Sequence, residues 1–151
     1  MGKVATASRS AVYVIGSLRN PRVPVVAAAI RAAGFDAFDD WYAAGPEADD
    51  IWQRYEQQRD HTYATGLAGW HADHVYSFDR HHLTRCGRGV LVLPAGKSAH
   101  IELGFMIGLG KPGFILLESG EPDRWDVMYK FATVVYDLPQ LLEELGAQDP
   151  P

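Results

Sequence analysis

Apolar residues gather in five short runs along the chain, each bounded by glycine, proline or polar residues. Runs of four or five residues are too short for helices, and nearly continuous apolar composition is typical of strands covered on both faces. The clearest run is Val90–Leu93, which lies between Gly89 and Pro94. The pattern predicts strands at residues 11–15, 35–39, 90–93, 113–117 and 133–136.

The segments between these runs have the composition of helices. Pro21 and Pro24 fit the first turn of a helix that Gly34 ends, and Gly110–Gly113 stops a strongly apolar helix. We predict helices at residues 21–33, 47–59, 62–78 (with room to extend to 83), 99–109, 126–132 and 139–145.

Strands that alternate with helices predict an α/β fold with right-handed crossovers between parallel strands. We expect a doubly wound, flavodoxin-like, three-layer sandwich with a five-stranded parallel sheet of order 2-1-3-4-5. The chain is expected to form one domain over residues 1–151, with loose tails at 1–10 and 147–151.

This strand order creates a switch point between the first and third strands, where open α/β sheets bind ligands. The loops 16–20 and 95–98 would flank one crevice there, with Asp39–Trp41 beside it. Asp39 and Asp40 fit a turn or a role in binding sugar or base, and Trp41 fits the core or stacking on a base. Alternation with Ile15 favours the core for Tyr13.

Glu102 lies in the first turn of the expected helix 99–109, just past the carboxyl end of strand 90–93. It is either a favourable charge at a helix N-terminus or a catalytic group that faces the crevice. Ser17, Ser98 and Arg19 are suited to bind a phosphate together with helix amides, and His100 either contacts the ligand or caps its helix.

Composition narrows the function further. Lys and Arg are scattered and the net charge is −5, which argues against a nucleic-acid surface. The single cysteine, Cys86, fits a reducing compartment, and no signal peptide or membrane-spanning run is evident, so a cytoplasmic protein without membrane contact is expected.

Common cofactor and metal motifs are also missing. The chain has neither a dinucleotide fingerprint nor a P-loop, and its six histidines lack the spacing of a zinc site. We therefore expect no cofactor and no bound metal.

Three motifs together resemble the nucleoside 2-deoxyribosyltransferase family and its relatives, the 2'-deoxynucleoside 5'-monophosphate N-glycosidases. They are Gly16–Arg19 after the first strand, Asp79 in the long helix, and Ser98–Gly104 at the third strand–helix junction. The similarity runs from about Tyr13 to Tyr136.

The resemblance implies that Glu102 attacks the anomeric carbon and that Asp79 protonates the departing base. It also implies that the first loop lines the site and that Ser98 contacts the sugar or its phosphate. Together with the crevice residues, the expected substrate-binding set is Gly16, Ser17, Arg19, Asp39, Asp40, Trp41, Ser98 and His100.

Two further features qualify the resemblance. Many transferases of the family have an aspartate where Gly96 stands, which casts doubt on a nucleoside without a phosphate as the substrate. A segment near the carboxyl terminus of the transferases reaches a neighbouring subunit's site; Met128 and Tyr129 are the matching residues, so a homo-oligomer is expected.

The expected function is cleavage or transfer of the N-glycosidic bond of a 2'-deoxynucleoside or its 5'-monophosphate, through a covalent glycosyl–glutamate intermediate. Two alternatives stay open. One is a hydrolase of another N-ribosyl bond, such as that of NAD, and the other is a non-catalytic nucleotide-binding module.

Overall fold

A computed structural model describes residues 11–148 and confirms the α/β fold. Its single sheet has five parallel strands in the order β2-β1-β3-β4-β5. The strands are β1 (Val12–Ile15), β2 (Ala37–Phe38), β3 (Arg88–Val92), β4 (Gly113–Leu116) and β5 (Thr133–Val135). The central pair β1–β3 runs from Val12 opposite Arg88 to Ile15 opposite Leu91.

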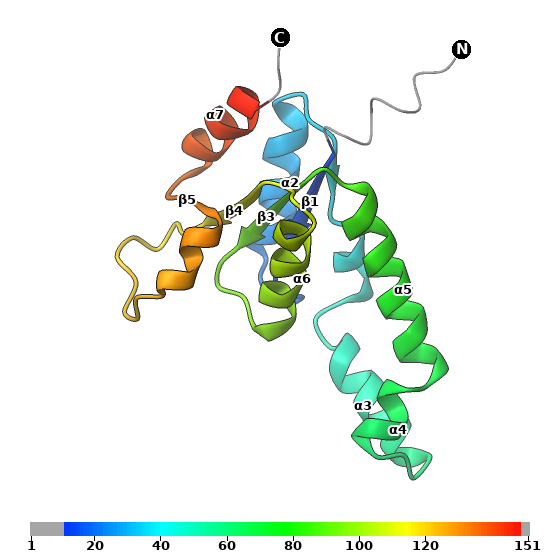
Figure 1. The fold of residues 1–151 in the computed structure, drawn as a ribbon. Coiled ribbons are helices and arrows are strands. Elements are labelled where there is room, and N and C mark those ends of the chain that lie inside the picture. The colour runs from blue at the N-terminus through cyan, green and yellow to red at the C-terminus, as the bar shows by residue number, and fades with distance from the viewer. Residues whose placement is uncertain (1–10, 149–151) are drawn as a thin grey trace, which may run out of the picture.

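Helices cover both faces of the sheet (Figure 1). They are α2 (Arg22–Ala32), α3 (Ala48–Gln58), α4 (Tyr63–Leu67), α5 (Trp70–Arg85), α6 (Lys97–Gly108) and α7 (Leu138–Gln148), with short 3-10 helices η1 (Asp40–Ala44) and η2 (Val127–Phe131). The expected layers and strand order are therefore both present.

The alternation of side chains along β1 assigns its residues to two separate cores. Val12 and Val14 pack against α2 and α7 on one face. Tyr13 and Ile15 point to the other face, where they meet α5 and α6. This two-residue period follows from strand geometry and decides which side chains can reach helix α6.

The predicted helix 62–78 is wrong as a single element, because α4 ends at Leu67 and α5 starts at Trp70. Gly66 and Gly69 lie at this break, and glycine weakens a helix interior. A Cβ at Gly66 would lie 3.2 Å from Cγ of Glu56, so the bare backbone lets α4 pack against α3. The helices α3 and α4 extend beyond the sheet beside the start of α5 (Figure 1).

Other boundaries also differ from the predictions. Helix α6 begins at Lys97, so Ser98 lies in its first turn and Glu102 in its second. Residues 147 and 148, expected in the loose tail, continue α7, while 1–10 and 149–151 lie outside the described residues. Strand β2 is short, because the Trp41 indole N–H donates to the carbonyl oxygen of Val14 at 2.8 Å beside it.

The end of α5 is anchored by a lysine from another part of the chain. The Lys111 ammonium group donates to the carbonyl oxygens of Leu83, Thr84 and Cys86 at 2.9, 2.5 and 2.7 Å. These carbonyls lie at a helix C-terminus, where a cation is favoured. Lys111 follows α6 directly, so this contact joins the ends of α5 and α6.

Candidate active site

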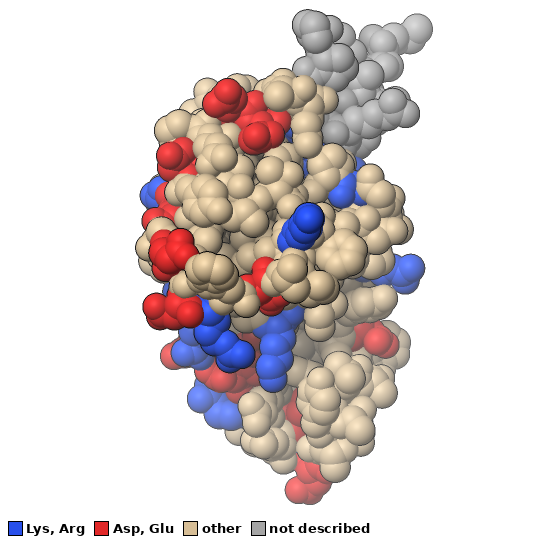
Figure 2. Space-filling model, turned by 60° about the vertical axis from the view of Figure 1, so that its left-hand side comes forward, with Lys and Arg blue, Asp and Glu red and all other residues tan. Residues whose placement is uncertain are grey.

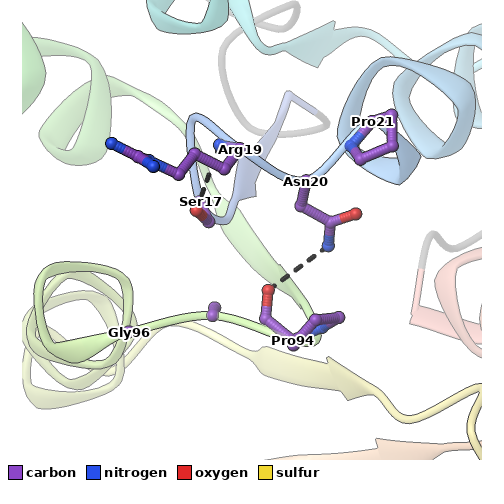
Figure 3. Close-up of a pocket in the computed structure, with 7 residues that line it drawn as sticks. Ser17, Arg19, Asn20, Pro21, Pro94 and Gly96 are labelled. Atoms are coloured by element: carbon purple, nitrogen blue, oxygen red, sulfur yellow. Dashed lines mark hydrogen bonds between the residues drawn. The ribbon is translucent and has the colours of Figure 1, made fainter. Parts of the chain in front are cut away.

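A cleft of about 350 Å³ opens at the carboxyl ends of β1 and β3, which is the expected switch point. It is lined by residues of the two loops that follow these strands: Ser17, Arg19, Asn20, Pro21, Pro94, Ala95 and Gly96 (Figure 3). The buried Asn20 donates its side-chain amide to the Pro94 carbonyl oxygen at 3.3 Å and so links the two walls.

The first loop is fixed by close packing against α2. A Cβ at Gly16 would lie 2.6 Å from Cγ2 of Val23, so any side chain there would push α2 away from the sheet. Ser17 accepts a hydrogen bond from the Arg19 backbone at 3.1 Å, which tightens the turn. Ser17 and Arg19 therefore line the cleft, and Gly16 precedes them in the same loop.

Tyr13, Asp79 and Glu102 form a second polar group, between the sheet and the two helices α5 and α6. None of them is among the residues that line the cleft. Tyr13 is 1% exposed, and its ring lies 5.2 Å from that of Phe38. Its hydroxyl approaches Glu102 and lowers the pKa of that carboxyl, although it does not reach standard hydrogen-bond geometry with any residue of 11–148. The Tyr13 hydroxyl is therefore placed to favour the ionised form of the Glu102 carboxyl.

Burial changes the acidity of both carboxyl groups. It raises the pKa of Glu102 to about 8, and the negative charge of Asp79 adds to this rise. Burial also raises the pKa of Asp79 to about 6. Because the two charges repel, the pair holds a single proton near neutral pH. The rise in the pKa of Glu102 is opposite in direction to the lowering that a helix N-terminus produces, and Glu102 lies in the second turn of α6 rather than the first.

Tyr13 is a member of this group that the sequence analysis assigned only to the core. Burial raises the pKa of its hydroxyl further above the usual value, with contributions from Glu102 and Asp79. The hydroxyl therefore stays protonated and acts as a donor. A buried tyrosine in place of phenylalanine, on the strand before the cleft loop, is the signal that could have identified it.

His100 links helix α6 to the segment η2. Its Nδ1 donates to the Gly96 carbonyl oxygen at 2.7 Å, which leaves Nε2 of the neutral ring to accept from the Tyr129 hydroxyl at 2.8 Å. The two rings also stack, with centroids 5.8 Å apart. His100 thus holds Tyr129 of the same chain beside the start of α6, and the neighbouring Met128 is 58% exposed.

The three residues expected beside the crevice have partners elsewhere. Asp39 pairs with Arg31 of α2 at 2.5 Å, and Trp41 bonds to β1 as described. Asp40 is exposed and close enough to His82 to raise the pKa of that imidazole, against a larger lowering by burial. These contacts attach the β2–η1 segment to its neighbours, and Ser98 is exposed in the first turn of α6.

The structure also shows how charged side chains are distributed on one face of the molecule and whether potential metal ligands lie together. Figure 2 shows Lys and Arg interspersed with Asp and Glu on one face of the molecule. Within residues 11–148, no group of three or more His, Cys, Asp or Glu side chains is placed to hold a metal ion. No helix in that range is long and apolar enough to cross a bilayer.

The strand order and the helices define a doubly wound α/β protein with a cleft at its switch point. One solved structure with a similar fold is the CMP N-glycosidase BcmB of Clostridium botulinum, with a TM-score of 0.52 and 14% sequence identity over 90% of this chain and 98% of that one. No protein-family model and no curated protein matches the sequence. The structural likeness supports the fold.

Proposed function

We propose that this protein cleaves the N-glycosidic bond of a 2'-deoxynucleoside 5'-monophosphate or the corresponding nucleoside. The observation that carries the proposal is the group Tyr13–Asp79–Glu102, in which two half-buried carboxyls have raised pKa values. Glu102 belongs to α6, the helix that begins at the cleft. Two such carboxyls are what a retaining glycosidase needs, one as nucleophile and one as acid and base. The similar fold of a CMP N-glycosidase agrees with this chemistry.

The proposed reaction starts from the form of the pair in which the proton has moved from Glu102, whose pKa is the higher, to Asp79. In that form the Glu102 carboxylate attacks the anomeric carbon as the bond to the base nitrogen breaks. The electron pair of that bond leaves with the base, and Asp79 supplies the proton that the base takes up. Water then attacks the anomeric carbon of the resulting ester and gives its proton to Asp79, while the bond from that carbon to the Glu102 oxygen breaks and restores the carboxylate. Attack by a second base instead of water would give transfer.

Tyr13 has a separate task in this scheme. Its hydroxyl donates toward the Glu102 carboxylate and so stabilises the ionised form, against the burial that favours the neutral form. Glu102 lies in the second turn of α6, where the helix dipole is already weak. The hydroxyl is therefore the main local group that favours ionisation of the nucleophile.

The cleft between the loops fits the phosphate of a nucleotide. It lies where α2 and α6 begin, and the amino ends of helices favour anions. Arg19 and Ser17 supply a cation and a hydroxyl at the same place. Gly96 leaves this wall open, with nothing within 4 Å of a Cβ placed there. We therefore expect a monophosphate to be preferred over its nucleoside.

A second copy of the chain is expected to cover the segment η2. Trp125, Val127, Met128 and Phe131 are each more than half exposed next to Tyr129, which contacts His100. A contiguous apolar surface of this kind is typical of an interface. Light scattering of the purified protein tests this, and a monomer at micromolar concentration would contradict it.

The decisive experiment is chromatographic detection of free base. The protein is incubated with deoxynucleosides and ribo- and deoxynucleoside 5'-monophosphates, with and without an acceptor base, and Glu102→Ala is run in parallel. We expect base release from monophosphates that the variant lacks while it keeps its melting temperature. A new nucleoside formed only with acceptor would assign a transferase.

The alternatives give different results in the same assay. Release of nicotinamide from NAD, with no reaction of the deoxynucleotides, would assign cleavage of another N-ribosyl bond. Thermal stabilisation by nucleotides without any turnover would assign a binding module. Undiminished turnover by Glu102→Ala would overturn the role of that carboxylate.

A further inference from the structure

Arg19 lines the cleft, but its guanidinium group is engaged outside it. Nη2 donates to the Asp50 carboxylate of helix α3 at 2.7 Å, across 31 positions of sequence. Figure 3 shows the Arg19 side chain extending away from Asn20 and Pro94, toward the edge of the cleft. The cationic side chain that lines the cleft is therefore held by an acidic side chain of α3.

Asp50 is chemically similar to the group that Arg19 would bind in a substrate. A carboxylate and a phosphate both offer anionic oxygens to a guanidinium fork, and arginine binds either by charge-assisted hydrogen bonds. Both partners are more than half exposed, with side chains 67% and 51% accessible. An exposed pair of this kind is weak and breaks readily in favour of a better anion.

We propose that Asp50 is an internal competitor of the substrate phosphate for Arg19. In the ligand-free protein Asp50 occupies the guanidinium group, and a 5'-phosphate in the cleft displaces Asp50 as Arg19 turns inward. The inference rests on the proposed function, which supplies the phosphate-bearing substrate. It makes α3, an element outside the cleft, part of the discrimination between nucleotides and nucleosides.

The chain offers a matched control for testing this role. Asp49 and Asp50 are adjacent, both are exposed, and both lie in the first turn of α3. Among the ion pairs of residues 11–148, Asp50 pairs with Arg19 and none includes Asp49. Asp49→Asn and Asp50→Asn therefore remove the same charge from nearly the same place, but only the second releases Arg19.

Steady-state kinetics with a nucleoside 5'-monophosphate and its parent nucleoside test the proposal. We expect Asp50→Asn to lower KM for the monophosphate by about two- to fivefold relative to Asp49→Asn, the range typical of an exposed ion pair. KM for the nucleoside and kcat for both substrates stay unchanged. In an Arg19→Ala background, Asp50→Asn has no further effect on KM, because the guanidinium group for which Asp50 and the phosphate compete is absent.

Titration calorimetry with inorganic phosphate separates this inference from the proposed function, because it requires no turnover. We expect Asp50→Asn to bind phosphate more tightly than Asp49→Asn by the same two- to fivefold factor at low ionic strength. Equal affinities in the two variants would overturn the inference even if base release is found. Weaker binding by Asp50→Asn would also overturn it, since Asp50 would then position Arg19 for the anion.

Discussion

The two faces of the sheet differ in what they bury. The face covered by α2 and α7 buries apolar side chains, from Val12 and Val14 of β1 to Leu141 and Leu145, and the cation Arg88, whose guanidinium group donates to the Leu145 carbonyl oxygen at 2.8 Å. The face covered by α5 and α6 has an apolar core too, but Tyr13, Asp79 and Glu102 bring polar atoms into its upper part. The first face contributes to the stability of the fold. The second face also holds the two proposed catalytic carboxyls, and keeping such polar groups away from water lowers stability.

The difference arises from one residue step along β1. Val14 points to α2 and Tyr13 points to α6, because neighbouring side chains of a strand face opposite ways. Substitutions on the face covered by α5 and α6 should therefore mainly change activity, and substitutions on the face covered by α2 and α7 should mainly change stability.

Replacing the proposed nucleophile should have the largest effect. Glu102→Gln is expected to lower kcat by at least ~10³-fold, because no other side chain replaces the attacking oxygen. It should also stabilise the protein above neutral pH. The folded pKa of about 8 exceeds the ordinary value of 4.5, so stability from the protonated form is full below pH 4.5 and lost as pH rises through 8.

Melting curves at pH 5 and pH 9 measure this second effect. The difference in Tm between Glu102→Gln and the parent protein should increase from pH 5 to pH 9, since glutamine does not titrate. A constant difference would mean that Glu102 is not buried in the way described.

On the other face, the expected result is reversed. Ile30 of α2 is fully buried, so Ile30→Ala should lower the free energy of unfolding by about 2–5 kcal/mol. Its kcat and KM, measured well below the melting temperature, should equal those of the parent protein. Denaturant titration and base-release kinetics check both halves, and a large loss of kcat would show that the two faces are coupled.

Asp79→Asn should lower kcat by about 10²-fold, the usual contribution of a general acid. The parent protein should show a bell-shaped dependence of kcat/KM on pH, with limbs near 6 and 8, because the reaction needs the pair with one proton. In the variant only Glu102 titrates, at a lower pH than before, so the residual activity should rise with pH and then stay level. A bell-shaped pH dependence of kcat/KM that persists in Asp79→Asn would mean that another group is the general acid.

Tyr13→Phe should have the smallest effect on the reactive face. Loss of the favourable influence of this hydroxyl on the Glu102 carboxylate should lower kcat by about tenfold. The pKa of Glu102 should rise, because the hydroxyl lowers it now, and the alkaline limb should move to higher pH. Stability should change little, since the hydroxyl has no partner of standard geometry within residues 11–148. Kinetics from pH 5 to pH 9 test this.

Sequence periodicity was sufficient for the fold, because continuous apolar runs and helix-ending glycines follow directly from burial on both faces of a sheet. The order of strands and loops also placed Ser17 and Arg19 at the switch point, since both residues follow a central strand, and the structure has them at the cleft. The pairing of Asp39 with Arg31 and of Arg19 with Asp50 could not be predicted, because such contacts depend on helix placement rather than on local pattern.

Tyr13 shows a different limit. Its place in an alternating strand correctly predicted burial, but burial of the ring says nothing about where the hydroxyl points. The break between α4 and α5 was missed for a related reason: single glycines within a helical pattern are tolerated, and only packing against Glu56 decides the outcome.

The Lys111 contact has a mechanical consequence for the reactive pair. Asp79 lies six residues before the end of α5, so its backbone is about 9 Å along the helix axis from that end. Lys111 fixes this end to the turn after α6, which carries Glu102. The ammonium group therefore holds together the ends of the two helices that carry the carboxyls, and so fixes how α5 lies against α6 at that end.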